Sequence, residues 1–130
     1  MIRRRQIILG TTTVIVGFSG CSALSSDPAT VNVTVLNDTE TPHRLRVELF
    51  QNEELRPEAR VVELMLNLEP GENLWRYDVA VARPYIVRHR LLRDGVTVEK
   101  GHNHYSPSGD GADDLGYIID SRDTLRFSSS

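Results

Sequence analysis

Four stretches in the first two thirds of the chain alternate apolar and polar residues with a period of two. Successive side chains of a strand point to opposite faces, so this alternation predicts strands with one buried and one solvated face. In the fourth stretch it places Trp75 and Tyr77 on the apolar side, which predicts that both belong to the core rather than to a ligand platform. The stretches are VNVTVLN (31–37), RLRVELF (44–50), VVELMLNL (61–68) and LWRYDVAV (74–81).

Turn residues separate these stretches and reveal further strands. Glu69-Pro70-Gly71-Glu72 has Pro and Gly where a type II turn requires them. Asp94-Gly95 lies between two apolar runs and is typical of a two-residue hairpin, in which both central residues take positive φ. Eight strands are predicted, at 31–37, 44–50, 60–68, 74–81, 85–93, 96–100, 116–120 and 124–128.

Short strands at regular spacing predict an all-β fold. We expect a single antiparallel β-sandwich of seven to eight strands over residues 31–130, with a small β-barrel as the alternative. Pro57 limits the one helix-compatible segment, 52–59, to about one turn. The order of an L-x-PGE turn, a strand, Pro84-Tyr85-x-Val87 and a DG turn resembles the immunoglobulin-like sandwiches of exported archaeal proteins. The chain lacks the Cys-Trp-Cys pattern of antibody domains, so the resemblance implies only the looser architecture.

The first 20 residues have the layout of a signal peptide. Three arginines at 3–5 precede an apolar run at 7–18, and Ser19 and Gly20 follow. The run is shorter than the roughly 20 apolar residues that span a bilayer, although an uncut membrane anchor is the alternative. Arg4-Arg5 with its apolar followers resembles a twin-arginine export signal, which implies that the domain folds before it crosses the membrane.

The single cysteine of the chain closes this leader. Phe18-Ser19-Gly20-Cys21 resembles a lipobox, with Phe in place of the commoner Leu. The resemblance implies that Cys21 carries a lipid, becomes the first residue of the mature chain and holds the protein on the outer face of the cytoplasmic membrane. Two acyl chains anchor firmly, whereas one holds only marginally. Residues 21–30 are then a lipidated cysteine and a flexible tether, rich in small and polar residues.

Composition excludes several functions. Without the three leader arginines, 12 basic residues face 18 acidic ones, which argues against nucleic acid as a partner. Beyond Cys21 the chain has no cysteine, which rules out a disulfide, a cysteine nucleophile and a Cys₂His₂ zinc site in the mature domain. Lys100 is the only lysine, a skew typical of salt-loving archaea and also of GC-rich coding.

Candidate chemistry gathers at 101–114, GHNHYSPSGDGADD, which we predict to be a long loop. His102 and His104, two residues apart, with Asp110 as a third ligand, could hold Zn²⁺ or Cu²⁺, and a solvated surface loop is the alternative. No cofactor is expected otherwise. His89 alternates with apolar neighbours and is predicted to lean toward the core.

Two N-x-Thr sequons, at Asn32 and Asn37, are candidate glycosylation sites on an exported protein. The sequence contains no G-x-S-x-G, although Ser106 and Ser108 lie near His104. We therefore expect a lipid-anchored surface module without catalytic activity that meets an envelope protein or a glycan. A metal-binding module and a surface hydrolase are the alternatives.

Overall fold

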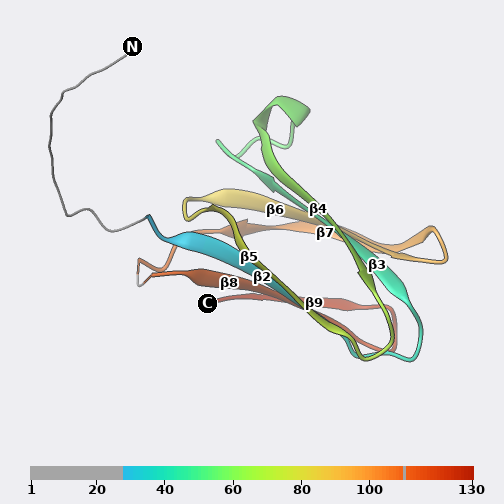
Figure 1. The fold of residues 1–130 in the computed structure, drawn as a ribbon. Coiled ribbons are helices and arrows are strands. Elements are labelled where there is room, and N and C mark those ends of the chain that lie inside the picture. Colours follow the sequence, from blue (N-terminus) through green and yellow to red (C-terminus); the bar gives the residue numbers. More distant parts are fainter. Residues whose placement is uncertain (1–27, 110) are drawn as a thin grey trace, which may run out of the picture.

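The computed structural model describes residues 28–109 and 111–130, so the predicted leader, Cys21 and Asp110 lie outside the described residues (Figure 1). Eight strands and one short 3₁₀ helix, η1 (Pro57–Ala59), make up the described chain. The strands are β2 (Thr30–Asn37), β3 (His43–Phe50), β4 (Arg60–Leu68), β5 (Asn73–Val81), β6 (Tyr85–Arg93), β7 (Val96–Tyr105), β8 (Asp113–Ile119) and β9 (Leu125–Ser129).

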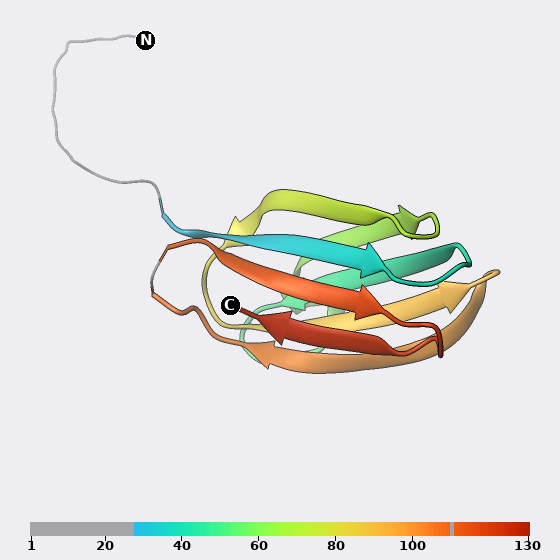
Figure 2. The same ribbon diagram turned by 90° about the horizontal axis from the view of Figure 1, so that it is seen from below.

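The strands form two four-stranded sheets, in the orders β5-β2-β8-β9 and β4-β3-β6-β7, stacked as a sandwich (Figures 1 and 2). The all-β sandwich prediction is confirmed, and the two separate sheets replace the barrel alternative. The prediction of a purely antiparallel arrangement is wrong for one pair, because β2 runs parallel to β8 from Val31–Asp113 to Asn37–Ile119. The first sheet is therefore mixed.

The core lies between the sheets, where the alternation of the sequence puts its apolar side chains. Val31, Val33 and Val35 of β2 are at most 1% exposed. They pack in one cluster with apolar residues from β3, β4, β6, β7, β8 and β9. Full burial of one such side chain contributes about 1.5–3 kcal/mol, so this cluster is the main source of stability.

Both turn predictions are confirmed in the backbone. Gly71 has φ +75 and Glu72 N donates to Glu69 O at 3.0 Å, as in a type II turn. Asp94 and Gly95 have φ +53 and +78, which a type I′ hairpin demands.

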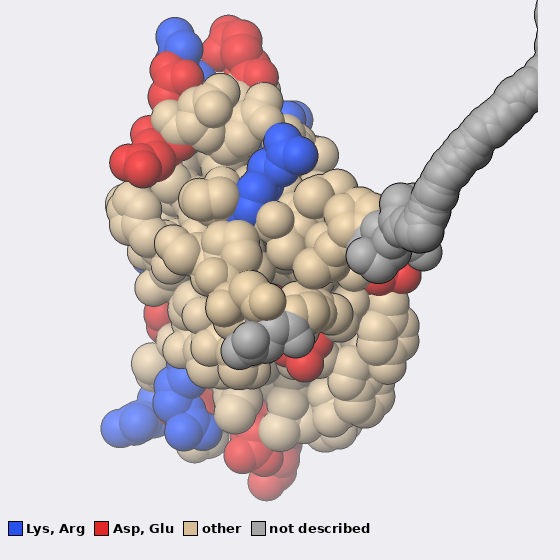
Figure 3. All heavy atoms as spheres, turned by 90° about the vertical axis from the view of Figure 1, so that its left-hand side faces the viewer, with Lys and Arg blue, Asp and Glu red and all other residues tan. Residues whose placement is uncertain are grey.

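The strand directions give the sandwich two distinct ends. We call the end where β2 begins the Thr30 end; the segments 51–59, 82–84 and 106–112 lie there with the C-terminus. The opposite end, which we call the Asn37 end, carries the four loops 38–42, 69–72, 94–95 and 120–124. Viewed from the Thr30 end, acidic side chains crowd the margin where Figure 1 places the 51–59 segment (Figure 3).

Strand β5 turns its aromatic residues outward, and the prediction that they belong to the core is wrong. Trp75 is 47% exposed and Tyr77 is 69% exposed. Directly paired residues of an antiparallel ladder share a face, and the pairing of Leu74 with buried Val35 turns Leu74 inward. Pairing with β2 therefore sets which face of this edge strand is buried.

Strand β7 is longer than predicted and contains both candidate metal ligands. It continues to Tyr105, which is 2% exposed and stacks on Tyr85 with ring centroids 6.3 Å apart. His102 and His104 therefore lie on a strand, and the connection to β8 spans only 106–112. The stacking of the two tyrosines accounts for the extra length of β7, because it extends the core beyond Gly101.

Candidate functional site

The outer surface of the β4-β3-β6-β7 sheet collects basic side chains. Removing Arg3, Arg4, Arg5, Asp27 and Asp110 from the whole-chain count leaves 12 basic and 16 acidic residues in the described part. Half of these basic residues lie on this one surface, although the described chain is net acidic. We call this surface the basic face; its six cations are Arg44, Arg46, Arg60, Arg88, Arg90 and Lys100.

The pairing of the strands puts like charges opposite one another across this face. Arg46 of β3 pairs with Arg90 of β6, and Arg90 pairs with Lys100 of β7. Like charges in direct cross-strand positions destabilise a sheet. A row of three cations is therefore an arrangement that stability does not favour, and it marks the face as a candidate binding surface.

A buried carboxylate holds one side of the face together. The side chain of Glu48, which is only 4% exposed, accepts hydrogen bonds from Arg88 Nε and Arg60 Nη1, each at 2.9 Å, and from Arg46 Nη2 at 3.3 Å. The Arg88 guanidinium also lies 4.7 Å above the Phe50 ring. The three arginines are thus fixed in place rather than freely rotating.

The pKa of Glu48 reflects this setting. Burial alone would raise the pKa, but hydrogen bonds from Arg88 and Arg60, with the charges of Arg88 and Arg46, outweigh burial and lower it. Glu48 is consequently a carboxylate at neutral pH, and it organises the arginines beside it.

Arg90 and Lys100 differ from these arginines because they form no ion pair within residues 28–109 and 111–130. Both are exposed and border a groove of about 410 Å³. The Nε atom of Arg46 is buried and has no hydrogen-bond partner among the described residues. The groove thus offers two unpaired cations beside a fixed guanidinium. Its lining is Arg46, Glu48, Arg88, His89, Arg90, Lys100, Gly101 and His102.

The two histidines predicted as metal ligands lie at the same edge of this face. His102 and His104 are exposed, with ring centroids 6.1 Å apart and planes at 75°. The described residues contain no group of three His, Cys, Asp or Glu side chains that could hold a metal ion, and Asp110 lies outside them. A metal at this pair stays a prediction, for which calorimetric titration with Zn²⁺ and Cu²⁺ is the measurement.

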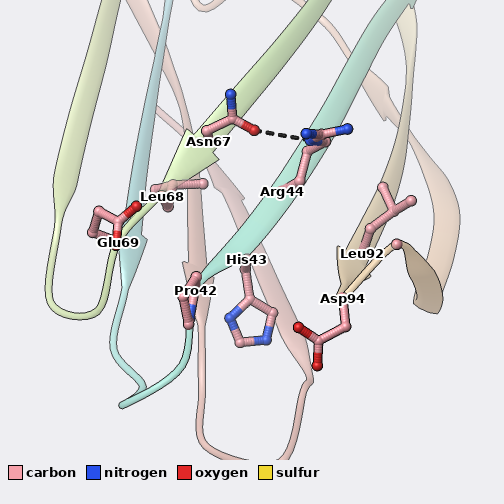
Figure 4. A pocket seen from close by; sticks show the side chains of 9 residues that line it. Pro42, His43, Arg44, Asn67, Leu68, Glu69, Leu92 and Asp94 are labelled. Carbon is pink, nitrogen blue, oxygen red and sulfur yellow. Dashed lines mark hydrogen bonds between the residues drawn. The ribbon is translucent and has the colours of Figure 1, made fainter.

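A second hollow, of about 460 Å³, lies at the Asn37 end beside His43 (Figure 4). The His43 side chain is fully buried; Nε2 meets Asp123 Oδ1 at 2.8 Å and Nδ1 meets Thr41 O at 3.0 Å. The hydrogen bond from His43 and the charge of Arg93 lower the pKa of Asp123. Arg44, the cation at this rim, already donates to Asn67 at 2.8 Å. The His43 and Arg44 side chains of this hollow thus already bond to other groups of the protein, which makes the hollow a weaker candidate binding site than the basic groove.

The remaining buried polar groups serve the fold. Asp113, which is 2% exposed, accepts from Tyr105 at 2.5 Å and from the Ser108 hydroxyl at 2.6 Å. Its carboxylate therefore fastens the 106–112 connection. His89 leans into the core as predicted, edge-on to Tyr117 at 5.8 Å, and burial lowers its pKa.

The two sequons have different surroundings. Asn32 is half-buried, and its Nδ2 donates to Asp114 at 3.0 Å; a glycan there stays a prediction. Asn37 is fully buried, and its Nδ2 donates to the carbonyls of Thr41, Leu68 and Glu69. Attachment of a glycan would replace one of the two Nδ2 hydrogens and would need access to this buried side chain; glycosylation of Asn37 also stays a prediction.

Comparison with known proteins identifies the architecture. No protein-family model matches the chain, and no curated protein matches it. Among solved structures it is similar to the T6SS lipoprotein TssJ1 from Pseudomonas aeruginosa, with a TM-score of 0.54 and 12% sequence identity over 79% of this chain and 98% of that chain. At this identity the likeness concerns the fold. In the described part of the chain, no helix has the length and apolarity to cross a membrane.

Proposed function

We propose that this protein is a lipid-anchored, non-catalytic β-sandwich that binds another component of the cell envelope. The observation that carries the proposal is the combination of a lipobox-like leader ending at Cys21 with a sandwich whose fold matches that of a known lipoprotein. The leader supports export and anchoring, and the fold supports a structural or binding role.

The length of the tether supports this arrangement. Eight residues separate Cys21 from Thr30. A fully extended chain covers at most roughly 3.6 Å per residue, so the domain begins within about 30 Å of the anchored lipid. The tether enters the domain at the Thr30 end, and the basic face lies on the side of the sandwich between the two ends.

The absence of enzyme activity is part of the proposal. In the described chain, Ser108 donates to Asp113, which also holds Tyr105, so this carboxylate already has a structural task. The surface hydrolase would need a serine activated by a histidine. The basic groove, in contrast, presents the hydrogen-bond donors and positive charges of Arg90 and Lys100, which can bind an anionic group but do not activate a nucleophile.

The intact mass of the protein from the membrane fraction of its host tests the anchoring. A chain that begins at Cys21 and carries added lipid mass is the expected result, and a Cys21→Ser variant should leave the membrane fraction. Ser26→Ala, a matched change in the tether, should remain there. A native chain that begins at Met1 without lipid contradicts the proposal and makes residues 7–18 an anchor.

A further inference from the structure

We propose that the groove of the basic face, bordered by Arg46, Arg90 and Lys100, binds an acidic segment of a partner protein. The inference deepens the proposed function, because it gives the anchored domain a binding site and its partner a chemistry. The supporting features are the charge row, the unpaired donors and the position of the face on the sandwich.

The charge row needs a counter-charge that the described chain does not supply. Arg46, Arg90 and Lys100 lie on three adjacent strands in one cross-strand row. Glu48 of β3 and Glu63 of β4 neutralise Arg46, but within residues 28–109 and 111–130 Arg90 and Lys100 have no carboxylate partner. A bound carboxylate between these two cations would offset their repulsion.

The donors match carboxylates. Guanidinium groups are planar and bind carboxylates with two parallel hydrogen bonds, and Arg is therefore typical of interfaces that recognise acidic groups. Arg90 and Lys100 are exposed at the border of the groove and have no carboxylate partner in the described chain, so both are accessible to a carboxylate from outside. A groove of about 410 Å³ admits side chains of a partner but not a whole domain.

The surroundings of the face favour a protein segment over a lipid surface. The 51–59 segment lies at the Thr30 end of the same sheet, and it carries Glu53, Glu54 and Glu58 against the single cation Arg56. Acidic groups crowd that margin (Figure 3). A broad anionic lipid surface laid on the face would also meet these carboxylates and be repelled by them, whereas an acidic segment can enter the groove beside Arg90 and Lys100 alone.

The test uses the full chain in detergent micelles and a fluorescein-labelled decaglutamate peptide as the probe, measured by fluorescence anisotropy. Each lost charge-assisted contact lowers affinity by roughly tenfold, so Arg90→Gln with Lys100→Gln should weaken binding at least about tenfold. The matched control, Arg76→Gln with Arg126→Gln, removes the same charge from exposed arginines on the other sheet and should change affinity less than about twofold. Added salt should weaken binding of the wild type more than that of the groove variant.

Three outcomes overturn the proposal. Equal weakening by both double variants would mean that net charge, not the groove, attracts the peptide. Saturation of the groove by inorganic sulfate, with no measurable peptide binding, would make it a site for a free anion. Binding to phosphatidylglycerol vesicles that needs Arg90 and Lys100, without peptide binding, would make it a lipid-binding surface. Loss of lipid at Cys21 would contradict the anchoring but leave the peptide measurement unchanged, so the two proposals fail separately.

Discussion

Replacing Glu48 by Gln removes the one carboxylate that three arginines of the basic face share. Glu48 accepts from Arg88 and Arg60, both at 2.9 Å, and from Arg46 at 3.3 Å, and its side chain is 4% exposed. Gln keeps one acceptor oxygen but loses the charge. The arginines would then repel one another without a central counter-charge.

The magnitude follows from the exposure of the partners. A hydrogen bond to a charged group contributes about 1.5–3 kcal/mol when buried, whereas an exposed ion pair contributes about 0.2–1 kcal/mol. The three arginine side chains are 30–42% exposed, so solvent screens each contact. We therefore expect Glu48→Gln to lower the free energy of unfolding by about 2 kcal/mol, which for a domain of this size lowers the Tm by roughly 10 °C.

Thermal unfolding followed by circular dichroism at neutral pH measures the effect. Glu63→Gln is the matched control, because Glu63 also contacts Arg46 but is 40% exposed. This variant should lower the free energy of unfolding by less than about 1 kcal/mol. Because the folded-state pKa of Glu48 lies below its ordinary 4.5, the advantage of the wild type should be complete above pH 4.5 and disappear as the pH falls through the folded-state value. A Tm change within about 2 °C of that of Glu63→Gln would refute the reasoning.

Three further outcomes are expected. Asn37→Ala removes the contacts of a buried amide with three backbone carbonyls, so the free energy of unfolding in urea should fall by about 2–3 kcal/mol; an unchanged urea midpoint would contradict the role of these hydrogen bonds. Trp75→Ala should lower the free energy of unfolding by less than about 1 kcal/mol, because the side chain is 47% exposed. Leu115→Ala, at a side chain that is 0% exposed, should lower it by about 2–5 kcal/mol. Equal urea midpoints for the two variants would contradict the exposed position of Trp75. Hydrogen bonds from Ser108 and Tyr105 lower the pKa of Asp113 below 3.8. Above pH 3.8 the wild type should therefore unfold at a higher urea concentration than Asp113→Asn, and this difference should disappear as the pH falls further. A difference in urea midpoint that does not depend on pH would contradict the assignment.

The period-two pattern predicted most of the fold because it reports a physical property of strands in a half-buried sheet. It placed Leu45, Val47 and Leu49 in the core correctly, since β3 is a central strand with a fixed dry side. It failed for Trp75 and Tyr77, which lie on an edge strand. There the register with β2 decides which side is buried, and a single strand's sequence does not contain that register.

The sequence predicted only parts of the basic face. The alternation put Arg44, Arg46 and Glu48 on the wet side of one strand, but the sequence does not say which strands are neighbours. Only the order β4-β3-β6-β7 brings Arg90 and Lys100 beside Arg46. The burial of Glu48 also escaped prediction, because it depends on arginines 12 and 40 residues away in sequence. Two exposed cations flanking a carboxylate-centred arginine cluster are a tertiary property.

The parallel pairing of β2 with β8 also determines the order in which the domain can fold. The first strand of the described chain, β2, lies inside its sheet, and one of its neighbours is separated from it in sequence by 82 residues, as in the pair Val31–Asp113. Sheets closed by such distant contacts form slowly, because a long loop must close before the contact stabilises it. An emerging chain therefore lacks a complete β5-β2-β8-β9 sheet until β9 has been made. Until β8 has been made, the margin of β2 that pairs with it is unpaired, although β5 already covers the other margin, so a chain truncated before residue 113 should associate through this margin rather than remain as separate molecules.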